Sequence, residues 1–189
     1  MMELVSEAVA FAVKAHDGMR RKKSEAPYIL HPMEAAVIVG TMTDDQNIIA
    51  AAVLHDVVED AGITIEEIEE RFGTRVRELV QSETEDKRAD LPPEDTWRIR
   101  KEESLRVLGD TDDRAVLMVW LGDKLANMRS IYRDFKAEGN AMWQRFHQKD
   151  EKAQAWYYRS IVGLTARLSD TSAWLEYKTL TELVFGKEE

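Results

Sequence analysis

Cysteine is absent from this 189-residue sequence. Its absence excludes disulfide bonds, thiolate catalysis and metal sites held by cysteine, so a metal ion would have to be bound by imidazole and carboxylate groups. The sequence also lacks an apolar run near the ~20 residues that a membrane span needs. The N-terminal residues lack the basic and then apolar pattern of a secretory signal. We therefore expect a cytoplasmic protein.

Positive charge is scarce, since 26 Lys and Arg residues face 36 Asp and Glu residues, for a formal net charge of −10. This balance argues against a nucleic-acid surface or an anionic membrane as the partner. One basic run, Arg20-Arg21-Lys22-Lys23, interrupts the acidic background. Such a run suits a small polyanionic ligand, although taken alone it is more typical of a solvated loop.

Apolar residues recur at helical spacing along most of the chain, and we find no internal repeat and no convincing pair of strands. The length fits one domain. We predict an all-α fold, a single-domain bundle of about eight or nine helices over residues 1–189. The expected helices are 3–16, 33–43, 48–58, 64–72, 74–81, 94–108, 114–132, 142–168 and 171–185. The polar segment 82–94, with two prolines, is the longest expected loop and is interpreted as a lid or recognition segment.

Four ionisable residues lie at the end of the apolar helix expected at 48–58 and just beyond it: His55, Asp56, Glu59 and Asp60. With 3.6 residues per turn, His55 and Glu59 share one helix face, and Asp56 and Asp60 share the adjoining face. Both faces can line one pocket. The simpler interpretation is a partly buried histidine that is hydrogen-bonded to a carboxylate near a helix end.

Two further residues strengthen the case for a metal site. His31 follows an extended segment, and Pro32 suits the first turn of the next helix. Asp123 lies within a strongly apolar helix and shares a face with Asn127. Buried charges are normally paired or bind metal. Two imidazoles and two carboxylates without sulfur suit Mn²⁺, Fe²⁺ or Zn²⁺, with positions left for water and a phosphate oxygen.

Several ordered motifs carry a specific resemblance. They are Ala15-His16, Lys22-Lys23-Ser24, Pro27-Tyr28-Ile29-Leu30-His31-Pro32, His55-Asp56-Val57-Val58-Glu59-Asp60 and Asp123-Lys124-Leu125-Ala126-Asn127-Met128-Arg129. Together they resemble the HD-domain hydrolase module of the RelA/SpoT homologue family, over about residues 9–131. The length is similar to that of the short stand-alone alarmone hydrolases, with the remaining helices at about 142–185.

The resemblance implies a Mn²⁺-dependent enzyme that releases pyrophosphate from the 3′ position of ppGpp or pppGpp, although another divalent metal would suit the same ligands. It implies four metal ligands, His31, His55, Asp56 and Asp123. It implies that Glu59 and Asp60 orient the attacking water and shuttle its protons. The implied substrate contacts are Lys22, Lys23, Lys124, Asn127, Ser130 and Lys87.

The chain departs from the family pattern at several positions, and these leave alternatives open. The family's Arg-Lys pair corresponds either to Lys22-Lys23 or, with a gap, to Arg21-Lys22. Ala126 and Trp120 stand where relatives often carry other residues, so the substrate is either an alarmone or another nucleotide such as NADPH or a dNTP. A nucleotide-sensing module without turnover is a third hypothesis. The oligomeric state is left open.

Two other groups of residues have both a functional and a structural interpretation. Lys87, Arg100 and Lys101 belong to motifs that resemble phosphate-binding motifs of the stand-alone hydrolases, but exposed helix and loop charges explain them equally well. The C-terminal aromatic cluster is better explained as core than as a ring that stacks on a purine. Its members are Trp143, Phe146, His147, Trp156, Tyr157 and Tyr158, and His147 is not counted as a metal ligand.

Overall fold

A computed structural model describes residues 3–21, 25–88 and 90–187. These residues form ten α-helices and two 3-10 helices, and they contain no strand beyond one isolated bridge between Arg20 and Pro27. The all-α prediction is confirmed. The elements are α1 (Leu4–Ala15), α2 (Leu30–Gly40), α3 (Gln46–Leu54), α4 (Val57–Ala61), α5 (Ile65–Phe72), α6 (Thr74–Glu83), α7 (Pro93–Asp110), α8 (Arg114–Glu138), η1 (Gly139–Arg145), α9 (Glu151–Leu164), η2 (Ala166–Leu168) and α10 (Ser172–Phe185).

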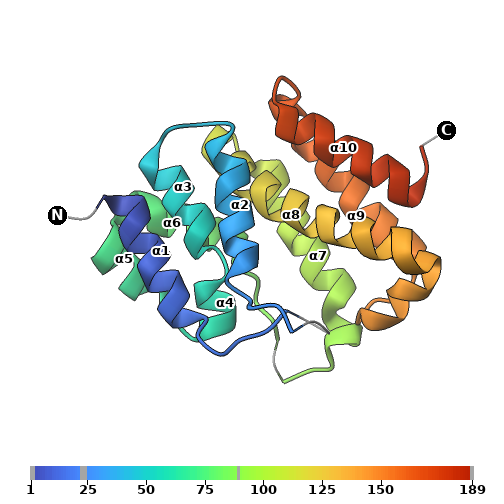
Figure 1. Cartoon of the computed structure of the whole chain (residues 1–189), viewed down its shortest axis with the longest axis horizontal. Coiled ribbons are helices and arrows are strands. Elements are labelled where there is room, and N and C mark those ends of the chain that lie inside the picture. Colours follow the sequence, from blue (N-terminus) through green and yellow to red (C-terminus); the bar gives the residue numbers. More distant parts are fainter. Residues whose placement is uncertain (1–2, 22–24, 89, 188–189) are drawn as a thin grey trace.

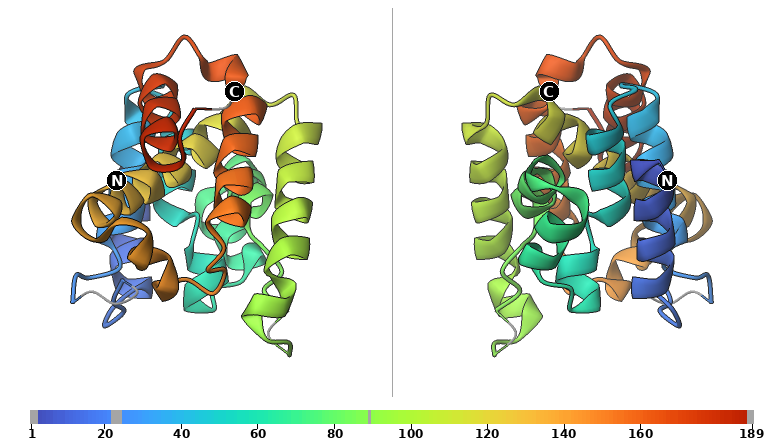
Figure 2. Two further views of the ribbon diagram at one scale, coloured as in Figure 1. Left: turned by 90° about the vertical axis from the view of Figure 1, so that its right-hand side faces the viewer. Right: turned by 90° about the vertical axis from the view of Figure 1, so that its left-hand side faces the viewer.

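The long helix α8 runs through the middle of the molecule (Figure 1). Asp113 caps its start by accepting a hydrogen bond from the Ala115 backbone N–H, and the residues that follow are almost all buried. Helices α1 to α6 lie on one side of α8, and α9 and α10 lie on the other. Helix α7 flanks the bundle beside α9, as the two turned views show (Figure 2). Both halves of the chain therefore pack on the helix that carries Asp123.

The helix expected at 48–58 is interrupted, and that prediction is wrong. Helix α3 ends at Leu54 and α4 begins at Val57, which leaves His55 and Asp56 between them. The His55 imidazole Nδ1 lies 2.8 Å from the Ala52 carbonyl oxygen, a backbone acceptor that a continuous helix would use for its own ladder. A new helical turn then starts with the bond from the Asp60 N–H to the Asp56 carbonyl. The break lets the adjacent side chains of His55 and Asp56 point toward the same place in the structure.

The helix expected at 142–168 is also divided. The 3-10 helix η1 ends at Arg145, and α9 begins only at Glu151, where Asp150 accepts a bond from the Lys152 N–H. Trp143 of η1 belongs to the core, where its ring stacks on that of Phe185 at the end of α10, with ring centroids 5.4 Å apart. The interpretation of this cluster as core therefore fits the structure better than base stacking does.

Within the described ranges, no helix has the length and apolar character needed to cross a membrane.

Candidate metal centre and active site

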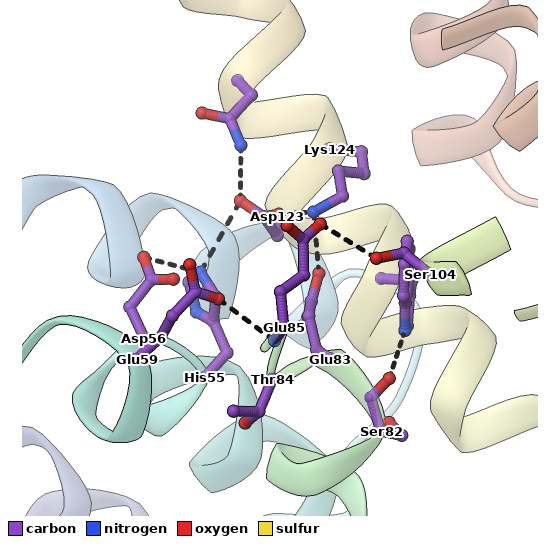
Figure 3. Close-up of polar contacts among 12 residues, drawn as sticks. His55, Asp56, Glu59, Ser82, Glu83, Thr84, Glu85, Ser104, Asp123 and Lys124 are labelled. Carbon is purple, nitrogen blue, oxygen red and sulfur yellow. Dashed lines mark hydrogen bonds and ion pairs between the residues drawn. The ribbon is translucent and has the colours of Figure 1, made fainter. Parts of the chain in front are cut away.

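Three separate elements bring the four predicted metal ligands together. His31 comes from the first turn of α2, His55 and Asp56 come from the break between α3 and α4, and Asp123 comes from α8. His31, His55 and Asp123 are buried, whereas Asp56 is half-buried. The site thus lies at the junction of α2, α3 and α8, and Asp56 is its most exposed ligand. Figure 3 shows His55, Asp56 and Asp123 close together.

The two imidazole rings face the two carboxylates. His31 Nε2 lies 2.8 Å from Asp123 Oδ1 and 3.6 Å from Asp56 Oδ2. His55 Nε2 lies 3.0 Å from Asp56 Oδ2 and 3.6 Å from Asp123 Oδ1. One ligand atom from each of His31, His55 and Asp123 falls within 4.8 Å of the other two. Nitrogen and oxygen donors therefore converge on a single small volume.

The hydrogen bonding of His55 indicates that this volume suits a cation. A carbonyl oxygen can only accept, so Nδ1 must donate to Ala52, and in the neutral ring Nε2 is then a bare acceptor. This buried Nε2 has no hydrogen-bond partner among the described residues, yet it faces carboxylate oxygens. Burial lowers the pKa of His55, but the charges of Asp56 and Asp123 outweigh it and hold that pKa well above its ordinary value, so the two carboxylates favour a positive charge at Nε2, either a proton or a metal ion in its place. The donor set therefore fits a divalent metal ion.

A second layer of contacts holds Asp123. The Asn127 side-chain amide donates to Asp123 Oδ1 at 2.6 Å, and the Lys124 ammonium donates to Asp123 Oδ2. Burial raises the pKa of Asp123, but the adjacent Lys124 charge and both histidines hold it well below its ordinary value. Lys124 also lies 3.1 Å from Glu83, a carboxyl that is itself buried (Figure 3). Asp123 is therefore fixed in its ionised form.

Glu59 and Asp60, the predicted catalytic pair, lie beside this centre on α4. Both are half-buried, and the Glu59 carboxylate accepts a bond from the Glu85 backbone N–H at 3.4 Å. The Lys87 ammonium lies 3.4 Å from Glu59 Oε1, donates to the Glu59 carbonyl and pairs with Asp60. Burial raises the pKa of Glu59, while Lys87 opposes that rise. A raised pKa makes the ionised carboxylate a stronger base, which suits a group that accepts a proton.

The predicted substrate contacts separate into several groups. Lys22 and Lys23 lie outside the described residues. Arg21, the alternative member of the basic pair, donates to Asn127 Oδ1 at 3.3 Å, which places it near the metal centre. Lys124 is largely buried between Asp123 and Glu83, so its charge is already compensated.

The two remaining predicted contacts lie on different elements. Lys87 comes from the 84–92 segment and pairs with the α4 carboxylates, whereas Ser130 lies on α8 two turns beyond Asp123. Arg100 and Lys101 pair with the Glu85 carboxylate at 2.9 and 2.5 Å, which ties α7 to the same segment. These two cations are therefore engaged within the protein.

Reasoning from the sequence missed two residues of the site. The Tyr28 hydroxyl lies within hydrogen-bond distance of carboxylate oxygens of both Asp56 and Asp60, a contact that no spacing in the sequence indicates. Glu83 had a detectable signal, because it continues the apolar positions Val76, Leu79 and Val80 of one helix face. A carboxylate at such a position needs a buried partner, which is Lys124.

Trp120 and Ala126, the positions at which this chain departs from the family pattern, are each only 1% exposed. Trp120 donates its indole N–H to the Ser82 carbonyl at 3.3 Å. Both side chains belong to the core of α8.

Comparison with known proteins finds the same domain. A model of the HD domain family matches residues 8–151. A chloroplastic protein of Arabidopsis thaliana, described as a putative GTP diphosphokinase, is 39% identical over 137 residues. A guanosine-3′,5′-bis(diphosphate) 3′-pyrophosphohydrolase of Aquifex aeolicus is 35% identical over 130 residues. Each alignment covers 69% of this chain, but the chain spans only 15% and 18% of the length of these two relatives.

Solved structures share the fold over most of the chain. A metazoan ortholog of SpoT, described as hydrolysing ppGpp and acting in starvation responses, superposes with a TM-score of 0.77 at 24% identity. That likeness covers 99% of this chain and 98% of the ortholog. A Listeria monocytogenes EGD-e protein superposes with a TM-score of 0.72 at 27% identity, over 83% of this chain and 99% of its own.

Proposed function

The chain belongs to the HD domain family, and on that premise we propose that it is a phosphohydrolase that removes the 3′-pyrophosphate from guanosine alarmones. The products are GDP or GTP and pyrophosphate. The Aquifex aeolicus relative and the metazoan SpoT ortholog support this substrate class, since both are described by this activity. The observation that carries the proposal is the convergence of His31, His55 and Asp123 beside two half-buried carboxylates.

The proposed metal is Mn²⁺, held by His31, His55, Asp56 and Asp123. The nitrogen and oxygen donor set and the unpartnered Nε2 of His55 support this assignment. A bound divalent cation supplies Lewis-acid chemistry at the phosphoryl group. Asn127 and Lys124 orient Asp123, and the Ala52 carbonyl fixes the tautomer of His55.

Glu59 and Asp60 are proposed to manage the protons of the reaction. The oxygen of a water molecule bonds to the phosphorus at the 3′ position, and the bond from that phosphorus to the ribose 3′ oxygen breaks. One proton leaves the water, and one proton is delivered to the 3′ oxygen. The raised pKa of Glu59 suits it to accept and return that proton. Asp60, which is hydrogen-bonded to Tyr28 and Lys87, orients the water.

The substrate's phosphates need positive charge beside the site. Lys87 is proposed to move from Glu59 and Asp60 onto the pyrophosphate, since its ammonium is on an exposed side chain and already contacts both carboxylates. The basic pair, either Arg21-Lys22 or Lys22-Lys23, is proposed to bind the nucleotide together with Asn127 and Ser130. The hydrogen bond from Arg21 to Asn127 supports a shared role for these two residues.

The test is hydrolysis of ppGpp with Mn²⁺, followed by product chromatography. Wild type is compared with Asp123→Ala, Glu59→Ala and an exposed control on α5, Glu66→Ala. We expect GDP and pyrophosphate from wild type and from Glu66→Ala, and a loss of at least about 100-fold in kcat for the two site variants.

A panel of NADPH and dNTPs completes the experiment. Cleavage of one of these with ppGpp left intact would replace the alarmone as the substrate while keeping the site. Binding of Mn²⁺ and nucleotide without turnover of any member of the panel would overturn the proposal in favour of a sensor.

A further inference from the structure

The Tyr28 hydroxyl lies between the two functional groups proposed above. Its oxygen is 2.8 Å from Asp56 Oδ2 and 2.8 Å from Asp60 Oδ2. Asp56 is a proposed metal ligand, and Asp60 belongs to the proposed catalytic pair. One phenol oxygen therefore links the metal centre to the group that orients the water.

The loop between α1 and α2 fixes this tyrosine independently of α4. The Tyr28 backbone N–H donates to the Met19 carbonyl at 3.0 Å, and its own carbonyl accepts from the His31 N–H at 2.9 Å. The ring lies between the His16 and His31 rings, with centroid distances of 5.1 and 6.1 Å. The position of the hydroxyl is thus set by backbone hydrogen bonds and ring contacts that do not involve α4.

A phenol is suited to this position because it carries one hydrogen and two lone pairs. Its hydrogen can be donated to either carboxylate, and its oxygen lies within hydrogen-bond distance of both. Asp56 and Asp60 are also four residues apart, so the contact spans one helical turn.

We propose that Tyr28 is a positioning residue that fixes Asp56 and Asp60 relative to each other at the start of α4. The inference rests on the proposed function, because it gives both carboxylates their roles. Without the hydroxyl, Asp56 would be held only by the two histidines, and Asp60 by Lys87 alone, among the described residues.

The experiment compares Tyr28→Phe with Tyr177→Phe. Tyr177 is a matched control, since its hydroxyl is also buried and donates one bond, to the Tyr158 carbonyl at 3.1 Å, in the C-terminal helices. Calorimetric titration with Mn²⁺ measures the metal Kd without any substrate. Hydrolysis of ppGpp gives kcat and KM, and thermal unfolding checks that both variants are folded.

We expect Tyr28→Phe to weaken Mn²⁺ binding about 10-fold and to lower kcat about 10- to 100-fold, with KM within about twofold of wild type. Tyr177→Phe should match wild type in all three quantities. Equal Mn²⁺ affinity and kcat in the two variants would overturn the proposal. A rise in KM alone would also overturn it, because Tyr28 would then contact substrate.

Failure of the proposed function is distinguishable from failure of this inference. If wild type binds Mn²⁺ but hydrolyses no nucleotide of the panel, the assignment of the substrate fails. The comparison of Mn²⁺ affinity between Tyr28→Phe and Tyr177→Phe still decides whether Tyr28 positions Asp56.

Discussion

Gly122 of α8 lies against Ala35 of α2 so closely that a Cβ atom on Gly122 would sit 2.9 Å from the Ala35 carbonyl oxygen. It would also sit 2.6 Å from Val39 Cγ2. The crossing of these two helices sets the metal centre, because His31 is one turn before Ala35 and Asp123 follows Gly122. The 2.8 Å contact between the His31 and Asp123 side chains depends on this close approach.

Gly122→Ala should therefore damage both stability and metal binding. The added methyl group meets backbone as well as a side chain, so α2 and α8 must move apart. We expect a loss of about 1–3 kcal/mol in the free energy of unfolding, measured by urea denaturation. The Mn²⁺ Kd should rise by at least about 10-fold in calorimetry, since both ligands shift.

Gly163→Ala is the matched control. Gly163 lies within α9, and a Cβ atom there would meet no atom within 4 Å. This substitution should leave Mn²⁺ binding unchanged and add about 0.5–1 kcal/mol of stability through helix propensity. Equal stability of Gly122→Ala and wild type would show that the two helices do not need the glycine.

The sequence carried enough information for much of the fold but not for its interruptions. Helices α1 and α8 were predictable because apolar residues recur along them at helical spacing, and Thr64 caps α5 by accepting from the Glu67 N–H as its motif predicted. The break at His55 depends on one side chain that bonds a backbone carbonyl. Hydrophobic periodicity cannot reveal such a bond, because the apolar residues continue at helical spacing on both sides of the break.

The candidate site divides in the same way. The ordered motifs predicted which residues to examine, and His31, His55 and Asp123 do lie together. Contacts between segments that are distant in the sequence could not be predicted, because a single sequence does not say which loops lie together in the fold. The hydroxyl of Tyr28 and the pairing of Lys101 with Glu85 are examples.

Binding of Mn²⁺ should stabilise the folded chain, because the ligands converge only in the native state. At 100 times the Kd, the ion adds about 2.7 kcal/mol, which for a chain of this size raises the Tm by roughly 5–10 °C. His55→Gln should abolish this rise in a thermal melt. His147→Gln, an exposed control, should retain it, and a chelator should reverse it. A full rise in His55→Gln would remove His55 from the ligand set.

Lys87→Met should move the acid limb of the kcat/KM profile to higher pH. Burial raises the pKa of Glu59, and the Lys87 charge opposes that rise, so removing the charge raises the pKa further. Glu59 must then lose its proton at a higher pH before it can act as a base. Lys87→Arg keeps the charge and should keep the profile. The measurement is kcat/KM for ppGpp from pH 5.5 to 9, because kcat/KM reports the free enzyme, in which Lys87 lies beside Glu59.

The same variant tests the substrate contact of Lys87. Loss of a charge-assisted bond to the pyrophosphate should raise KM about 10-fold in Lys87→Met. An acid limb at the wild-type pH together with a raised KM would mean that Lys87 binds substrate without acting on Glu59.

Glu83 should make the stability of the chelator-treated protein fall as pH rises from about 5 to 8. Burial, opposed by Lys124, raises the pKa of Glu83 from 4.5 in the unfolded chain to about 8 in the folded protein. Between these values the folded state binds a proton that the unfolded state does not. The free energy of unfolding therefore decreases with pH in this window. Below about pH 4.5 both states are protonated, and the contribution no longer changes.

Glu83→Gln removes this titration while keeping the shape of the side chain. Relative to wild type, the variant should gain stability on the order of 2 kcal/mol between pH 5 and pH 8, measured by urea unfolding with chelator present. Glu78→Gln, an exposed change on the same helix, should follow the wild-type curve throughout. Because Lys124 is held by Asp123 as well as by Glu83, the amide need not release it. Parallel curves for Glu83→Gln and wild type would mean that Glu83 is ionised in the folded protein across this range, as one half of a buried ion pair with Lys124.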